Sequence, residues 1–190
     1  FPFMITNGEG SISVSETETG YELFYQIVEI SEDTYKEIEE IESSGTEITD
    51  QLAKELETLY TESNELKTVY DDAYAAYQEK VQEGAEETEI EAALKAYQLA
   101  EENYQNKVSE YNNAVENYNN TIQEISDSIK NLIPMYVEDN WTKTEDNSFS
   151  IDLTQFSGEK AFAVWAMLVT ADGTVHYDEM TYTTSGTKIE

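Results

Sequence analysis

Two stretches of the chain carry apolar or aromatic residues at steps of three and four, and the two series match when one is read backwards. The earlier series runs from Ile38 to Tyr77 and the later one from Leu94 to Leu132. If the chain folds back at residues 84–87, Leu59 faces Tyr111, and each such pair of residue numbers sums to 170 or 171. A constant sum is what two antiparallel helices packed along a heptad seam require. The sequence therefore predicts a long antiparallel coiled-coil hairpin. Its other facing pairs are Ile38–Leu132, Ile48–Ile122, Leu66–Tyr104 and Tyr77–Leu94.

The predicted helical segment covers residues 32–133. Ser31, followed by two acidic residues, is typical of a helix N-terminus, and Pro134 is typical of the residue that ends a helix. The run Ser43-Ser44-Gly45 predicts a break that divides the first arm into a short helix and a long one.

The tip of the hairpin is predicted at residues 84–88. Gly84 suits the C-terminal cap of the first arm. Thr88 and Glu91 have the spacing of a capping box, which predicts the start of the return arm.

Tyrosine recurs every seven residues on the return arm, and we interpret these side chains as packing in the seam. They are Tyr97, Tyr104, Tyr111 and Tyr118. The first arm carries a second stripe of Tyr60, Tyr74 and Val81, which we expect to lie near Ala93, Ala96 and Ala100 of the return arm. Such residues are also ordinary on a helix flank, but they could form a dimer or partner face. The candidate interaction surface consists of Tyr60, Tyr74, Val81, Gly84, Ala85 and Thr88.

Strand patterns precede and follow the helical segment. Residues 11–15 alternate apolar and polar side chains, and residues 21–30 are rich in aromatic and β-branched ones. Residues 149–153 alternate again, and residues 162–169 are apolar on both faces, as in a central strand. Asp172-Gly173 then predicts a two-residue hairpin turn into a final edge strand. Residues 174–177 run back from this turn, and residues 180–183 continue the edge strand.

Neither strand block is long enough to fold alone. We therefore expect residues 1–31 and 135–190 to form one discontinuous β domain, with the hairpin of residues 32–133 inserted between its strands. The predicted fold class is α+β, an antiparallel β-sandwich carrying an inserted helical hairpin.

The segment from Phe156 to Ala166 resembles the corner and penultimate strand of fibronectin type III and immunoglobulin-like modules. Phe156 stands six positions before the aromatic Phe162, and Val164 and Ala166 continue the inward alternation. Phe162 occupies the place where the family pattern has a tyrosine. The resemblance implies an immunoglobulin-like sandwich with a binding or spacer role, as in surface proteins of Gram-positive bacteria and in phage tail and fibre proteins.

The charge and composition of the chain exclude several function classes. Its 190 residues carry 41 acidic and 10 basic side chains, a formal charge of −31, and the basic ones are all lysine. Such a surface repels nucleic-acid phosphates and anionic lipid headgroups. The absence of cysteine excludes disulfides and thiolate metal sites. No apolar run is long enough to insert into a membrane.

Catalytic and metal-binding patterns are weak. His176 is the single histidine, and we expect it to be a surface residue of a strand. The chain has no glycine-rich phosphate loop. The acidic runs at 138–140 and 145–147 lack the ligand spacing of a calcium-binding EF-hand. We therefore predict no catalytic residues, no cofactor and no metal.

The sequence favours a non-enzymatic extracellular module of a bacterial cell surface, which presents a binding surface on a rigid stalk. The alternative is a structural subunit of a phage virion or an extracellular filament that packs through the hairpin. The expected partner is a protein or a surface glycan, and the chain itself is expected to be a monomer or a homo-oligomer formed through the hairpin.

Overall fold

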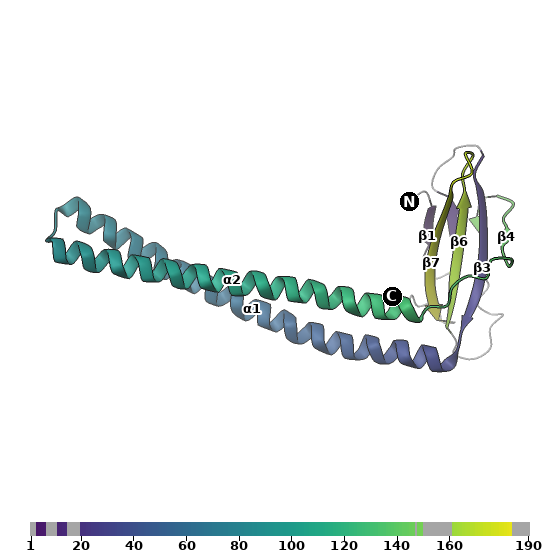
Figure 1. The fold of residues 1–190 in the computed structure, drawn as a ribbon, viewed down its shortest axis with the longest axis horizontal. Helices are drawn as coiled ribbons and strands as arrows, with labels where there is room; N and C mark the ends of the chain where they lie inside the picture. Colours follow the sequence, from purple (N-terminus) through teal and green to yellow (C-terminus); the bar gives the residue numbers. More distant parts are fainter. Residues whose placement is uncertain (1–2, 7–10, 15–19, 147, 150–160, 184–190) are drawn as a thin grey trace. The chain divides into compact units, whose positions relative to one another are not determined.

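The computed structural model describes residues 3–6, 11–14, 20–146, 148–149 and 161–183. Its elements in chain order are β1 Phe3–Thr6, β2 Ser11–Val14, β3 Glu22–Ile30, α1 Glu32–Glu83, α2 Glu87–Leu132, β4 Thr142–Lys143, β5 Ser148–Phe149, β6 Ala161–Val169 and β7 Val175–Thr183 (Figure 1). The fold is α+β, and both helices lie between β3 and β4 in the chain. The chain divides into two compact units, a β unit of Phe1–Glu42 with Ser126–Glu190 and a hairpin unit of Ser43–Ile125.

Strands from both ends of the sequence form one antiparallel sheet, as predicted. Its strand order is β4-β3-β6-β7, and a second sheet has the order β1-β2-β5. The nine residues of β3 pair with the nine of β6, from Glu22 opposite Val169 to Ile30 opposite Ala161. The inserted helices therefore begin and end on a domain that residues on either side of them build together.

The larger buried cluster of the β unit lies on one face of the four-stranded sheet, and Ile30, Ala161 and Ala163 are buried on the opposite face. Alternate side chains of β3 and β6 point to the face of the larger cluster, because successive residues of a strand point to opposite sides. The buried cluster consists of Leu23, Phe149, Phe162, Val164, Ala166 and Leu168. The Tyr25 ring stacks on Phe149 of β5 at a centroid distance of 4.1 Å. Each fully buried Leu, Val or Phe of such a core stabilises the fold by about 1.5–3 kcal/mol.

Residues 170–174 connect β6 to β7, and residues 171–173 form a three-residue turn between the hydrogen-bonded Thr170 and Thr174, so the predicted two-residue turn is wrong in length. Thr170 N donates to Thr174 O at 2.9 Å, and Gly173 N donates to Thr170 O at 2.9 Å. Gly173 has a φ of 85°, which glycine adopts without strain. The Asp172 carboxylate accepts hydrogen bonds from the Thr170 hydroxyl and from Thr174 N, and these bonds lower the pKa of Asp172 to about 2. An Asp-Gly pair is compatible with both turn lengths.

Parts of the predicted β region lie outside the described residues. Phe156, and the predicted strand 149–153 beyond Phe149, belong to residues 150–160. Within the described residues, the four-stranded sheet is open and antiparallel. The sandwich stays a prediction.

α1 begins where the sequence predicts. The Ser31 hydroxyl oxygen accepts a hydrogen bond from Thr34 N at 3.2 Å, and Ser31 O accepts one from Tyr35 N at 2.9 Å. Glu32 and Asp33 then occupy the first turn, where the helix dipole favours negative charge. Ser31 is therefore the N-cap.

The predicted break at Ser43-Ser44-Gly45 is wrong, because α1 is continuous for 52 residues. A glycine inside a helix costs about 1 kcal/mol relative to alanine, which is too little to interrupt a helix that packs along its whole length. Gly45 is buried, and a Cβ at this position would lie 3.0 Å from Cγ2 of Ile125. The glycine thus lets the Ile125 side chain approach the backbone of α1.

The predicted place of Ile48 and Ile122 in the seam is also wrong. Steps of three and four read back from Leu56 through Leu52 reach Thr49 rather than Ile48, and Thr49 is the less exposed of the two. The side chains of Ile48 and Ile122 are 46% and 42% exposed. Glu42 takes the same phase nearer the start of α1, where burial, and then the neighbouring Glu39, raise its pKa.

The rest of the seam keeps the predicted register. Gly45 meets Ile125, and the Tyr60 ring lies 6.1 Å from the Tyr111 ring, so these pairs sum to 170 and 171. Figure 1 shows α1 and α2 running antiparallel beside each other. The hairpin prediction is therefore confirmed.

The tip confirms the Gly84 cap and corrects the start of α2. Gly84 has a φ of 66°, its N donates to Val81 O at 3.3 Å, and Ala85 N donates to Lys80 O at 3.1 Å. These two bonds form a Schellman motif. Glu86 O accepts the first bonds of α2, which begins at Glu87, so Thr88 lies inside the first turn and is not the N-cap.

Candidate functional site

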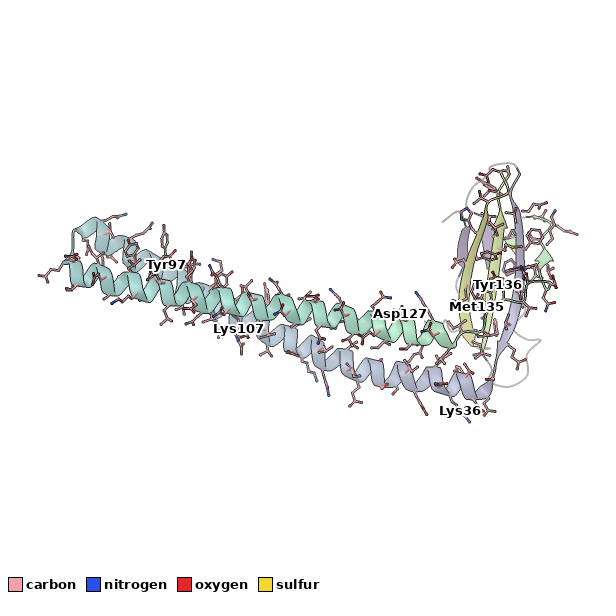
Figure 2. All side chains as sticks on the ribbon, viewed as in Figure 1. Lys36, Tyr97, Lys107, Asp127, Met135 and Tyr136 are labelled. Carbon is pink, nitrogen blue, oxygen red and sulfur yellow. The ribbon has the colours of Figure 1, made fainter. Side chains whose placement is uncertain are left out.

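Tyrosine rings gather in the distal half of the hairpin unit. Tyr97 of α2 lies at the centre, with ring centroids 5.5 Å from Tyr70, 5.2 Å from Tyr74 and 6.1 Å from Tyr77 (Figure 2 labels Tyr97). Tyr70 also contacts Tyr104 at 5.9 Å. The predicted seam role of the α2 tyrosines is consistent with this packing. Because Tyr70 lies between Tyr97 and Tyr104, the aromatic contacts also fix the register of the two helices.

The environment of Tyr97 favours its neutral form. A hydrogen bond with Tyr70, followed by partial desolvation and the charge of Glu101, raises the pKa of Tyr97 to about 12. Deprotonation would place an anion among tyrosine rings and beside a carboxylate, which is unfavourable. Tyr97 is thus a packing residue at neutral pH and carries no charge there.

Tyr74 of this cluster is exposed, and so is Tyr60, whose ring lies 6.1 Å from Tyr111. Tyr60 is 57% exposed and Tyr74 is 41% exposed, and Val81 is also largely exposed. The Tyr74 hydroxyl accepts a hydrogen bond from Gln78 Nε2 at 2.7 Å. Tyr60, Tyr74 and Val81 are separated by multiples of seven residues, so they share one face of α1. The predicted second stripe therefore exists as an exposed aromatic face.

The two flanks of the hairpin differ in chemistry. Lys107 of α2 pairs with Glu62 of α1 at 3.0 Å, which defines a charged flank. Residues two apart on a helix are rotated by about 200°, so Tyr60 lies on the flank opposite Glu62. By the same argument Gln105 lies opposite Lys107, on the flank of Tyr60.

Four successive α2 positions that share the face of Gln105 are uncharged amides, whereas Glu91, seven residues before Gln98, takes the same position nearer the tip. The four amides are exposed, and they are Gln98, Gln105, Asn112 and Asn119. We call these four residues, together with Tyr60, Tyr74 and Val81, the Tyr face. In a chain of charge −31, four successive uncharged residues at one heptad position are a distinct feature.

The predicted location of three alanines is wrong. Ala93 and Ala100 are fourteen and seven residues before Lys107, so they belong to the charged flank. Ala96 shares the face of Glu110, whose carboxylate also pairs with Lys107, at 2.8 Å. Ala100 is buried, since its small side chain lets the helices approach. These alanines lie at the same level of the hairpin as Tyr74 and Val81, but the sequence pattern does not show on which flank.

The remaining candidate residues lie at the tip. Gly84 and Ala85 form the Schellman motif, with Ala85 half-buried, and Thr88 is exposed in the first turn of α2. Lys80 and Glu89 approach each other at 3.9 Å across the tip. These contacts stabilise the turn, whereas the aromatic rings of the Tyr face lie along the arms.

The β unit contains an aromatic cluster that the sequence analysis missed. Tyr136 stacks on Tyr177 at 4.8 Å and meets Trp165 and Trp141, each at 5.2 Å (Figure 2 labels Tyr136). A hydrogen bond with Tyr136 is the main cause that raises the pKa of Tyr177. Trp165 and Tyr177 lie on the sheet face opposite the core, because they alternate with the inward residues.

This cluster holds the segment after α2 against the sheet. Gln26 is buried in β3, and its amide both donates to Val137 O at 2.9 Å and accepts from Val137 N at 2.8 Å. Trp165 Nε1 donates to Pro134 O at 3.0 Å. The paired bonds satisfy a buried amide as a neighbouring strand would. The cluster is therefore a structural clasp with an exposed rim at Met135 and Tyr177.

The single histidine of the chain, His176, lies half-buried on β7. Among the residues that the structure describes, no group of three or more His, Cys, Asp or Glu side chains could hold a metal ion. Over the same residues, neither helix has a stretch long and apolar enough to span a membrane.

Comparison with models of known protein families, with curated proteins and with solved structures gives no match to this chain.

Proposed function

We propose that the protein is a non-enzymatic extracellular interaction and spacer module of a bacterial surface protein. The proposal rests on the share of the chain that forms the two long helices. Helices of 52 and 46 residues take up about half of the 190 residues, and they fill their interior with leucine, isoleucine and tyrosine. At 1.5 Å per residue, α1 is about 78 Å long. A packed hairpin of this kind supplies distance and an elongated face.

We further propose that the β unit is an immunoglobulin-like or fibronectin type III-like sandwich. The strand order supports this: β1, β2 and β5 form one sheet, and β4, β3, β6 and β7 form the other. The placing of β1, β2 and β5 against β3, β6 and β7 matches that of strands A, B and E against C, F and G in immunoglobulin-like domains. The stacking of Phe149 of the first sheet on Tyr25 of the second is the contact expected between inner faces.

The spacer role is tested by shortening the hairpin without changing its register. Residues 59–65 and 105–111 face each other, so deleting both removes one heptad from each arm. Spin labels at Asp50 and Glu83 lie about 50 Å apart along α1, and the deletion should shorten this distance by about 10 Å. We expect one narrow distance distribution before and after the deletion. A broad distribution, or a distance that does not change, would contradict a rigid spacer.

The second candidate is a structural subunit of a virion or filament that packs through the hairpin. The exposed Tyr60, Tyr74 and Val81 favour it, since an assembly would bury them. Sedimentation equilibrium separates the two candidates. A spacer sediments as a monomer at micromolar concentration, whereas an assembly subunit associates and loses this association on Tyr60→Ala/Tyr74→Ala.

A further inference from the structure

We propose that the Tyr face docks a basic amphipathic helix of a partner protein, which lies along α1 and α2 as a third helix. The inference rests on the proposed interaction role and names the chemistry of the partner. The heptad pattern of a helix shows how many helices it contacts. A two-helix coil needs apolar residues only at its seam positions, whereas helices that contact a further helix extend the apolar stripe to an adjacent position.

α1 shows this wider stripe in the distal half of the hairpin unit. The position that carries Tyr60, Tyr74 and Val81 is interrupted by a single lysine, Lys67, which pairs with Asp71 at 2.6 Å. Tyr60 and Tyr74 already contact Tyr111 and Tyr97 of α2 through one side of their rings. Their other sides are exposed, and tyrosine with one free ring face is an effective anchor in protein interfaces.

The rim of the Tyr face gives the sign of the partner's charge. Three residues before each exposed tyrosine stands an exposed acid, Glu57 before Tyr60 and Asp71 before Tyr74, one helical turn away on the same side. On the α2 side the rim is made of the amides Gln98, Gln105 and Asn112. Asp71 is already paired with Lys67, so a docked helix would place lysine or arginine beside Glu57 of α1, where this carboxylate and the tyrosine rings attract cations.

The same charges disfavour a second copy of this chain as the occupant. Each copy carries a charge of −31, and packing two Tyr faces together would bring Glu57 and Asp71 of one copy close to acids of the other. A basic helix gains from the field that repels a second copy. The distance from Tyr60 to Val81 corresponds to about 31 Å of helix, or about six turns.

The test uses the full chain and a labelled 21-residue helical peptide that has leucine at positions i, i+3, i+4 and i+7 and lysine on both sides of this stripe. Fluorescence anisotropy is measured at 150 mM and 500 mM salt. We expect Tyr60→Ala/Tyr74→Ala to weaken binding about tenfold or more at both salt concentrations. Tyr60→Phe/Tyr74→Phe, which keeps the rings, should retain most of the affinity.

The matched control is Val69→Ala. Val69 is as exposed as Tyr60 but is seven residues after Glu62 and so lies on the charged flank. It should change the affinity by less than about twofold. A peptide with glutamate in place of lysine should not bind. Melting curves of each variant show that the hairpin remains folded.

Three results would overturn the proposal. Equal losses in the Val69 and tyrosine variants would show charge attraction without a docking face. Equal binding of the glutamate peptide would remove the role of the acids. A wild-type chain that dimerises, and loses its dimer on Tyr60→Ala/Tyr74→Ala, would make a second copy the occupant. The distance between the two spin labels along α1 does not depend on any of these three results. The spacer role can therefore be confirmed even if the Tyr face does not bind a basic helix.

Discussion

The two units of the molecule bury their side chains in different ways. In the β unit, Leu23, Phe162, Val164 and Leu168 are almost completely inaccessible to solvent. In the described hairpin unit the buried positions are Gly45, Ser63 and Ala100, and the larger seam residues are only half-buried. A sheet can cover a side chain from several directions, whereas a two-helix seam covers it from one. The β unit thus concentrates its stability in a few residues, and the hairpin distributes it over many.

The same difference appears in the aromatic residues. In the β unit, Tyr136 of the segment after α2 packs on Trp165 of the sheet, and both side chains are partly buried. In the hairpin unit, Tyr60 and Tyr74 lie at the edge of the seam with much of each ring exposed. Partial burial in the seam therefore leaves tyrosine surface exposed to solvent on the hairpin.

The largest expected effect is on the β unit. Phe162→Ala removes a fully buried ring, and we expect it to lower the free energy of unfolding by about 3–5 kcal/mol. Urea unfolding followed by tryptophan fluorescence measures the loss, because both tryptophans lie in this unit. A loss below about 1 kcal/mol would show that the core on this sheet face contributes little.

The matching substitution in the hairpin should have a smaller effect. Leu66→Ala truncates a half-buried seam residue, and we expect a loss of about 1–2 kcal/mol, measured by circular dichroism at 222 nm during thermal unfolding. Equal losses for Leu66 and Phe162 would contradict the contrast between concentrated and distributed stability.

The tip should respond to backbone conformation rather than to burial. Gly84→Ala places a Cβ at a φ of 66°, and we expect it to destabilise the hairpin by about 1–2 kcal/mol. Gly84→Asn serves as the control, because asparagine tolerates this conformation and should lose less. If both variants melt like the wild type, the Schellman motif does not limit the stability of the tip.

The smallest effect concerns pH. The folded-state pKa of Tyr97, about 12, lies above the ordinary value of 10, so its contribution to stability is complete below pH 10 and is lost as the pH rises toward 12. Melting temperatures at pH 9 and pH 11.5 should differ less in Tyr97→Phe than in the wild type. Identical differences would mean that the hydroxyl of Tyr97 does not couple to folding.

The sequence predicted most of the hairpin because its contacts follow a fixed period. Leu59, Tyr111 and their neighbours repeat at helical spacing, and one turn at Gly84 sets the register of all of them. Ile48 was placed wrongly because it is apolar, although the alternation of three and four read back from Leu56 through Leu52 reaches Thr49.

The aromatic clasp could not be predicted in the same way. Tyr136 and Trp141 lie in an irregular segment without a period, and Gln26 and Val137 are separated by 111 positions in the chain. Only the pairing of β3 with β6 places Gln26 beside Trp165. The Tyr face was partly predictable: the spacing of Tyr60, Tyr74 and Val81 indicated it, but the choice of flank required the Lys107–Glu62 ion pair.

The central claim is that the β unit folds on its own core and carries the hairpin as a separate unit. The most direct test deletes residues 43–125 and joins Glu42 to Ser126 by a short Gly/Ser linker. The account predicts a β-type circular dichroism spectrum, cooperative melting and native-like emission from Trp165. An unfolded product, or melting without cooperativity, would show that the hairpin is part of the core and would contradict the account.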